Sequence, residues 1–146
     1  MNISTKAIYG VKAMVDMAKN YPDDFATVKS IAERQNIPEK YLEQIFSILK
    51  KTGLLISVRG SSGGYSLAKP PREITVGDIL RVIEGELVPV DCVTENKYRV
   101  KCERTDICIT RYVWARIRDG INNVVDNITL KELAEGYAGL DVRSEN

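Results

Sequence analysis

The sequence predicts a mainly α-helical protein with one small β-hairpin and one long helix in its second half. Residues 27–68 combine two short amphipathic helical patterns around a tight turn with two β-type runs that flank a glycine-rich turn at 60–64. Residues 108–127 repeat apolar side chains at the spacing of a helix that packs against another helix. This order of elements is that of a winged helix-turn-helix followed by a long dimerisation helix.

Two helices are predicted before the turn at 35–38. Ser4 or Thr5 is placed to cap the first helix, which ends in the turn at 20–24. Thr27 is placed to cap the second helix, which ends at the turn. The inward-facing residues chosen by helical spacing are Ile8, Val11, Met14, Val15 and Ala18 in the first helix, and Val28, Ile31 and Ala32 in the second.

A third helix and the hairpin complete the first half of the chain. Pro38 suits the first turn of this helix, which runs to about Lys51 and stops at Gly53. The hairpin, called the wing below, spans residues 54–68, and Arg59 stands at the entrance of its glycine turn. The buried stripe of the third helix is Leu42, Ile45, Phe46 and Leu49, and its opposite face shows Lys40, Glu43, Gln44, Ser47 and Lys51.

Further elements follow the wing. Two prolines at 70–71 break the chain, and Thr75 is placed to cap a helix over 76–84. A polar loop over 85–107 leads to the long helix, and the spacing of a capping box at 129–132 predicts a short last helix. The predicted domains are a winged helix-turn-helix at 1–84, a cysteine-bearing loop at 85–107, and a dimerisation helix with its C-terminal segment at 108–146.

The long helix carries an apolar seam with heptad-like spacing. Such a seam either covers the core of its own domain or packs against the same helix of a second copy. A two-fold dimer is the favoured interpretation, because wings and recognition helices usually act in pairs on paired DNA half-sites. The seam residues are Val113, Ile117, Ile121, Val124 and Ile128, and Trp114 and Val125 widen the apolar band.

Composition excludes several classes of protein. No apolar run approaches the roughly 20 residues that a membrane helix needs. The N-terminus lacks the layout of a signal peptide, so a cytoplasmic protein is expected. With no histidine, catalytic Ser-His-Asp and Cys-His sites are absent. We find no other catalytic constellation, and the glycine turn lacks the Lys-Ser or Lys-Thr pair of a phosphate-binding loop. An enzyme is therefore not expected.

The third helix and the wing point instead to double-stranded DNA as the partner. Residues 1–75 hold 11 Lys and Arg against 7 Asp and Glu, a net charge of +4, whereas residues 76–146 hold 10 against 13, a net charge of −3. The helix suits the major groove, and the wing tip with its arginine suits an adjacent minor groove. Taken alone, the helix face is also what any solvated amphipathic helix shows. The candidate DNA-binding residues are Lys40, Tyr41, Glu43, Gln44, Arg59 and Gly60.

The remaining candidates for a metal-binding or redox-active site are three cysteines: Cys92, Cys102 and Cys108. An odd number of cysteines in a cytoplasmic chain disfavours a disulfide framework. Lys101 and Arg104 flank Cys102 in a charged loop and favour its thiolate. The spacing favours an iron–sulfur cluster or zinc, with thiol redox sensing and no function as the alternatives.

Five runs of sequence resemble the IscR, NsrR and CymR family of bacterial winged-helix regulators over nearly the whole chain. They are ISTKAIYG at 3–10, YLEQ at 41–44, SVRG at 57–60 with GGY at 63–65, ITVGDI at 74–79 and NITLKEL at 127–133. The IscR branch is the most similar, because it also has three loop cysteines before its long helix. The resemblance implies a homodimer with crossing long helices, a [2Fe–2S] cluster on the three cysteines, and DNA reading by Glu43, Gln44 and Arg59. Glu43 matches a position tied to discrimination between two classes of DNA site. Lys40 matches a position that is usually small and polar.

The chain departs from the IscR branch in two ways. Its cysteines are separated by nine and five residues rather than five and five, and Arg111 stands where that branch has its histidine ligand. The fourth ligand is left open among a carboxylate (Asp91, Glu95, Glu103 or Asp106), a group from elsewhere in the dimer, or none.

Together these features predict a transcription regulator that senses iron–sulfur cluster status. The expected targets are iron–sulfur assembly genes, and the expected action is that of a repressor. The alternative is a cluster-free, CymR-like regulator that acts through thiol oxidation or a partner protein.

Overall fold

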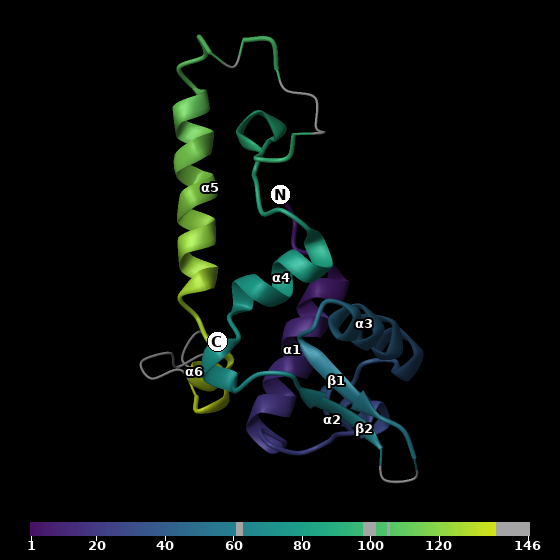
Figure 1. Ribbon diagram of the computed structural model, residues 1–146. Helices are drawn as coiled ribbons and strands as arrows, with labels where there is room; N and C mark the ends of the chain where they lie inside the picture. The colour runs from purple at the N-terminus through teal and green to yellow at the C-terminus, as the bar shows by residue number, and fades with distance from the viewer. Residues whose placement is uncertain (61–62, 98–101, 105, 137–146) are drawn as a thin grey trace, which may run out of the picture.

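The computed structural model describes residues 1–60, 63–97, 102–104 and 106–136. Within them, a helical body carries a two-stranded wing at one end, and one long helix stands beside the body (Figure 1). This confirms the predicted fold class. The elements are α1 (Thr5–Asn20), α2 (Val28–Gln35), α3 (Glu39–Lys51), β1 (Leu55–Val58), β2 (Gly64–Leu67), the 3₁₀ turn η1 (Pro71–Glu73), α4 (Val76–Glu84), the 3₁₀ turn η2 (Asp91–Val93), α5 (Arg111–Asp126) and α6 (Leu130–Ala134).

The first three helices begin and end where local sequence dictates. The Ser4 hydroxyl accepts from the Ala7 N–H at the start of α1, and the Thr27 hydroxyl accepts from the Ser30 N–H at the start of α2. Asn36 ends α2 in the left-handed conformation at φ 54°, which asparagine tolerates better than most residues. The predicted stripe of α3 is confirmed, because its four apolar residues are fully buried in the main core.

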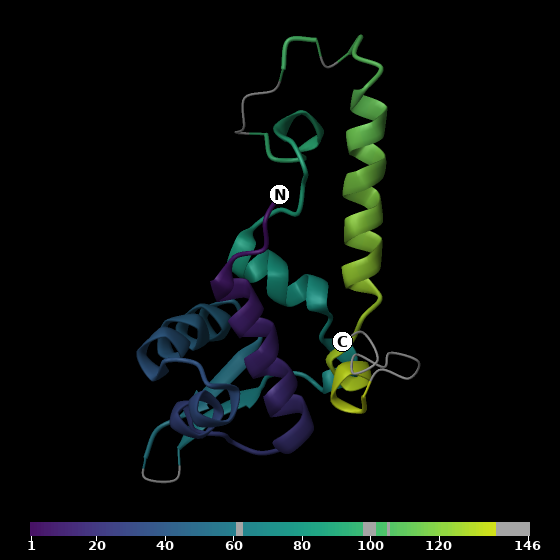
Figure 2. The ribbon, with the colours of Figure 1, turned by 180° about the vertical axis from the view of Figure 1, so that it is seen from behind.

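The inward face predicted for α1 is wrong at Ile8, which is 44% exposed. The buried face instead uses small residues, including Ala7, Gly10 and Ala13. A Cβ on Gly10 would collide with the side chain of Ile83, so the missing side chain lets α4 pack closely against α1. Figure 2 shows α1 crossing α4 and running down toward α2. The spacing of apolar residues predicted that Ile8 is buried, whereas the close packing of α1 on α4 requires small residues on the buried face.

The wing is an antiparallel pair in which Leu55 faces Leu67 and Val58 faces Gly64. Its inner side chains, Leu55 and Leu67, are buried in the core, which anchors the wing beside α3. The middle of the predicted glycine turn, residues 61–62, lies outside the described residues, as do 98–101 and 105 in the cysteine-bearing loop and 137–146 in the predicted C-terminal segment.

Helix α4 has the predicted bounds because both of its ends are encoded locally. Thr75 and Asp78 form a reciprocal capping box at its start, and Gly85 follows its last residue with φ 82°. The Val76 N–H donates to the Ile128 carbonyl oxygen, and the Leu130 N–H donates to the Ile74 carbonyl oxygen, both at 2.9 Å. This short bridge fixes the α5–α6 junction against the start of α4. Residues 1–84, which hold α1–α4 and the wing, are called the reading head below.

The long helix starts later than the sequence predicted. It begins at Arg111 rather than near Cys108, and Thr110 precedes it without a side-chain cap. The predicted loop before it also contains the 3₁₀ turn η2. None of the helices in the described part of the chain is long and apolar enough to cross a membrane.

Asp16 is the one charged residue among the described core positions, and it ties α1 to α2. Its side chain is 2% exposed and accepts from Arg34 Nη2 at 2.7 Å, Arg34 Nε at 3.0 Å and Gln35 Nε2 at 2.9 Å. Burial raises the pKa of this carboxyl, but the hydrogen bonds from Arg34 and Gln35 and the charge of Arg34 outweigh burial, so the pKa lies below its ordinary value of 3.8.

Asp16→Asn is expected to lower the free energy of unfolding by about 2 kcal/mol at neutral pH, the scale of hydrogen bonds to a charged group. A depressed carboxyl pKa stabilises the folded state above the unfolded-state pKa, and this contribution is lost as pH falls through the folded-state pKa. Urea denaturation at pH 7 and at pH 3 should therefore give a difference between wild type and variant that shrinks at the lower pH. The exposed Asp23→Asn is the control, and an equal effect there would contradict the role of Asp16.

Candidate nucleic-acid interface and cysteine site

The outer face of α3 is presented as the sequence predicted. Burial of its apolar stripe fixes the rotation of the helix, so Lys40, Glu43 and Gln44 are all exposed. Together with Ser47 and Ile48 they line one shallow groove. Tyr41 is half-buried, and its ring packs edge-on against Tyr9 with 5.6 Å between ring centroids. A rigid helix that offers an amide, an ammonium and a carboxylate side by side has the groups needed to read base edges.

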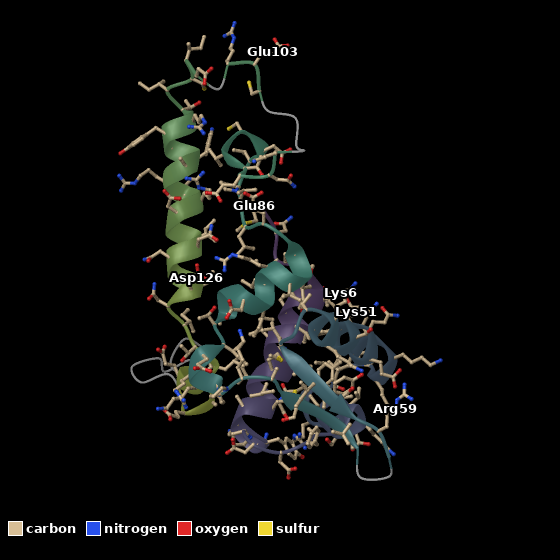
Figure 3. The ribbon with its side chains drawn as sticks, in the orientation of Figure 1. Lys6, Lys51, Arg59, Glu86, Glu103 and Asp126 are labelled. Carbon is tan, nitrogen blue, oxygen red and sulfur yellow. The ribbon has the colours of Figure 1, made fainter. Side chains whose placement is uncertain are left out.

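Lys6 of α1 lines the same groove, although no pattern in the sequence singled it out. It is separated from Glu43 by 36 intervening residues, so only the packing of α1 beside α3 brings the two together. Figure 3 shows Lys6, Lys51 and Arg59 on the side of the molecule that carries α3, away from α5. A basic residue at the edge of a base-reading groove suits contact with a phosphate.

Arg59 and Gly60 lie at the end of β1 and are both exposed. Gly60 has φ 123°, a conformation that residues other than glycine rarely adopt, and its carbonyl oxygen accepts from the Gly63 N–H at 3.0 Å. A Cβ on Gly63 would collide with the carbonyl oxygen of Val58. The glycines therefore allow a tight turn from which the exposed Arg59 side chain can project.

The three cysteines lie at the other end of the molecule. Cys92 is half-buried in η2, whereas Cys102 and Cys108 are exposed, and none is disulfide-bonded. Figure 3 places Glu103, next to Cys102 in the chain, at the end of the molecule opposite Arg59. Within the described ranges, no three Cys, Asp or Glu residues lie close enough together to hold one metal ion. Thiol donors suit an iron–sulfur cluster, but this arrangement of the loop does not bring all three together.

Cys108 has the most distinctive environment of the three. Its Sγ lies 3.0 Å from the Thr110 hydroxyl. That contact and the backbone N–H groups of Arg111 and Thr110 lower the pKa of the Cys108 thiol below its usual value. A thiol with a lowered pKa is more often a thiolate near neutral pH, which is the form that binds metals and reacts with oxidants.

Two arginines of α5 hold the turn that contains Cys92. Arg111 Nε donates to the Cys92 carbonyl oxygen at 3.3 Å, and Arg118 Nη1 donates to the Val93 carbonyl oxygen at 2.9 Å. On the other side of the turn, Glu86 accepts from the Thr94 hydroxyl and, at 2.7 Å, from the Glu95 N–H. Sequence reasoning passed over Glu86, although a carboxylate just after the glycine that ends α4 is well placed for this contact.

The reading head is joined to α5 by a second polar cluster. Arg81 of α4 donates to both carboxylate oxygens of Asp126, at 2.7 and 2.8 Å, and to Asn122 Oδ1 at 2.6 Å. Asn122 Nδ2 in turn donates to the Leu87 carbonyl oxygen at 3.0 Å. A bidentate arginine fixes orientation as well as distance, so α4, α5 and the start of the cysteine-bearing loop are positioned together.

The predicted seam of α5 divides into two faces. Ile121 and Val125 pack against a small cluster of Ala7, Leu80 and Leu87, so these two residues cover the core of their own chain. The other face is called the arm stripe below, and it has open space around Gly120. Its apolar members are Val113, Ile117 and Val124, which are 45%, 40% and 58% exposed.

The chain is similar to known regulators over nearly its whole length. The family model Rrf2, described as an iron-dependent transcriptional regulator, matches residues 3–136. The transcriptional regulator CymR of Bacillus subtilis is 43% identical over 92% of this chain and 90% of its own. The regulator IscR of Pectobacterium carotovorum is 38% identical over 97% of this chain and 84% of its own.

Solved structures agree with these sequence matches. The structure of CymR, the global cysteine regulator of B. subtilis, aligns with a TM-score of 0.76 at 41% identity, covering 92% of this chain and 97% of that one. The structure of T. potens IscR aligns with a TM-score of 0.72 at 40% identity, covering 99% of this chain and 96% of that one. Both kinds of regulator therefore share the fold described above.

Proposed function

This chain belongs to the Rrf2 family of transcriptional regulators, and from that membership we propose that it binds operator DNA as a homodimer whose choice of sites is set by a [2Fe–2S] cluster on Cys92, Cys102 and Cys108. The observation that carries the proposal is spatial. The polar face of α3, Lys6 and Arg59 share one side of the reading head, while Glu103, next to Cys102 in the chain, lies at the far end of the molecule.

DNA reading follows from the groups that α3 and the wing present. Gln44 offers the paired donor and acceptor that match adenine, Lys40 offers a donor for guanine or phosphate, and Glu43 accepts from cytosine. Glu43 also repels phosphates, so its carboxylate acts chiefly against unsuitable sequences. Arg59 meets a narrowed minor groove, where the negative potential is strongest.

The cysteines are the groups that would hold the cluster, since thiolates are its usual ligands. When bound, the cluster supplies a response to iron supply and to oxidants. Because the three thiols do not lie together in this arrangement, holding a cluster would require the loop that bears Cys102 to rearrange relative to the turn held by Arg111 and Arg118. That rearrangement would act on the hydrogen bonds that Thr94 and Glu95, the two residues after η2, donate to Glu86, and Glu86 directly follows the glycine that ends α4. The contacts of Arg81 provide a second connection from α5 to α4, which packs on α1.

A thiol sensor without a cluster is the second candidate, and Cys108 is the observation that favours it. This exposed thiol, with its lowered pKa, has the properties of a reactive cysteine. In that case a peroxide, rather than cluster loss, changes the loop: the Cys108 thiolate takes up one peroxide oxygen to become a sulfenic acid, and the other peroxide oxygen leaves as water or an alcohol. The two candidates differ in whether iron and sulfide copurify with the protein under anaerobic conditions. Iron–sulfur assembly genes are proposed as targets only if the protein is the cluster-binding regulator.

Arg59→Ala is expected to weaken binding to a selected operator by about 1–3 kcal/mol, the range for a good contact between a side chain and DNA. The variant should fold normally, because Arg59 is exposed and lies outside the core. Fluorescence anisotropy with labelled operator at near-physiological salt measures the change. Lys19→Ala is the control, because this exposed residue of α1 lines a different groove, together with Lys12 and Arg34. Unchanged affinity in Arg59→Ala would remove the wing arginine from the interface.

Lys6→Ala is expected to weaken binding to all DNA sequences by a similar factor and to reduce the slope of log affinity against log salt by about one. The reason is that a phosphate contact releases counterions but carries no sequence information. Salt titrations on a specific operator and on a scrambled duplex measure both quantities. Lys12→Ala, on another face of α1, should leave the slope unchanged. A loss confined to the specific operator would instead assign Lys6 to base reading.

A further inference from the structure

Arg111 contacts the backbones of two of the three cysteines. Its N–H donates to the Cys108 carbonyl oxygen at 3.2 Å, and its Nε donates to the Cys92 carbonyl oxygen at 3.3 Å. A guanidinium stays protonated and offers no lone pair, so Arg111 cannot be a metal ligand. It nevertheless stands at the sequence position where the resemblance leads one to expect a ligand. Its contacts indicate a different task there.

Arg118 strengthens the same attachment. It lies seven residues, or about two helical turns, after Arg111, so both arginines share one face of α5. Their guanidinium groups hold consecutive carbonyl oxygens, those of Cys92 and Val93. Glu86, two residues after the end of α4, accepts hydrogen bonds from the next two residues of the chain, Thr94 and Glu95. The turn that carries Cys92 is therefore fixed between α5 and the end of α4.

Cys102 belongs to a different part of the loop. It is exposed, and the bonds that Arg111 and Arg118 make to the loop backbone go to Cys92, Val93 and Cys108. Among the described residues, no three Cys, Asp or Glu side chains form a group that could hold a metal ion. The Arg111 side chain thus holds the Cys92 backbone at the start of α5, three residues after Cys108.

We propose that Arg111 is a positioning residue that holds Cys92 beside Cys108, so that the metal-free protein already presents a two-thiol half-site and Cys102 completes the site last. The proposal deepens the proposed cysteine-based sensing and rests on it for its purpose. It gives a physical reason for an arginine at this position. Bringing Cys92 to Cys108 closes a loop of 15 intervening residues at a cost in chain entropy. The arginine contacts offset that cost before any metal binds.

The test uses the metal-free protein and needs no cluster. In a Cys102→Ala background, Cys92 and Cys108 are the only thiols, and a short bis-maleimide can either bridge them or attach singly to each. Mass spectrometry of the intact protein and of its peptides gives the ratio of bridged to doubly modified chains. Removing the arginine side chain should lower this ratio by about threefold or more, because the effective concentration of one thiol at the other falls.

Three variants test whether a change in the bridging ratio is specific to the Arg111 side chain. Arg111→Ala should lower the ratio, and Arg111→Lys, which keeps a donor and the charge, should restore part of it. Arg116→Ala removes an arginine of the same helix that contacts Tyr112 instead, so its ratio should match the parent protein. Thermal unfolding of each variant separates a local change from a general loss of stability.

Equal bridging in Arg111→Ala and the parent protein would overturn the proposal, and so would an equal fall in Arg116→Ala. The outcome is independent of the cluster. If bridging depends on Arg111 but the protein binds no iron and sulfide, the two-thiol half-site is supported and its function is that of a thiol sensor. If the cluster forms but the bridging ratio is the same with and without the Arg111 side chain, the cluster assignment is retained and Arg111 is not a positioning residue.

Discussion

Ile117→Glu is expected to convert a dimer into a monomer of 16.4 kDa and to abolish high-affinity operator binding at the same time. Ile117 lies in the arm stripe, between Val113 and Val124, and all three side chains are exposed in the single chain. Gly120 has open space around it, which allows a second helix to approach closely. A carboxylate placed in such an apolar interface is left buried and unpaired in each copy, at a cost of about 3 kcal/mol or more.

A matched control lies on the same helix. Asn123→Glu adds the same charge to an exposed position outside the arm stripe, so it should leave the dimer intact. Sedimentation at micromolar concentration distinguishes the two masses, and anisotropy with paired and single half-sites tests DNA binding in the same samples. The monomer should lose the preference for paired half-sites. An Ile117→Glu protein that still sediments as a dimer would place the interface elsewhere.

Replacing any one of the three cysteines by alanine is expected to abolish stable retention of the cluster. In the proposed site each thiolate supplies one protein ligand, and the chain has no histidine that could replace it. The effect should be nearly all-or-none in the visible spectrum after anaerobic reconstitution. Cys102→Ala is the most informative single change, because Cys102 is exposed and lies outside the turn that Arg111 and Arg118 hold.

The triple cysteine variant should still fold, dimerise and bind some DNA sites. None of the cysteines belongs to either apolar cluster, so the core beneath α1–α4 and the wing forms without them. Far-ultraviolet circular dichroism, sedimentation and operator binding check the three properties. A triple variant that fails to fold would show that the cysteine-bearing loop is structural. A Cys102→Ala protein that reconstitutes as fully as wild type would remove Cys102 from the ligand set.

The sequence predicted the reading head well because its signals are local. Thr75 and Gly85 mark both ends of α4, and the apolar stripe of α3 identifies the face that must point outward. The start of α5 was placed three residues early because no side chain caps it. Ile8 was placed inside because periodicity counts apolar residues, whereas the close approach of α1 and α4 required alanine and glycine.

The candidate sites were predictable only in part. Residues within α3 could be assigned to one face by helical geometry, but Lys6 joins that groove through tertiary packing that no local pattern records. Ile121 fits the heptad-like seam by spacing, yet it covers the chain's own core because α4 lies beside it. The attachment of Cys92 by Arg111 and Arg118 depends on the path of a loop, which spacing between cysteines does not determine.

One measurement tests the central claim that a cysteine-bound cluster controls the choice of DNA. Protein reconstituted anaerobically is analysed for iron and sulfide, and its affinity for a panel of operators is measured before and after the cluster is removed. We expect about two iron and two sulfide atoms per chain. We also expect relative affinities across the panel to change by about 1–3 kcal/mol, the usual scale of coupling between two sites. Colourless protein, or an affinity ranking that is the same with and without the cluster, would contradict the claim.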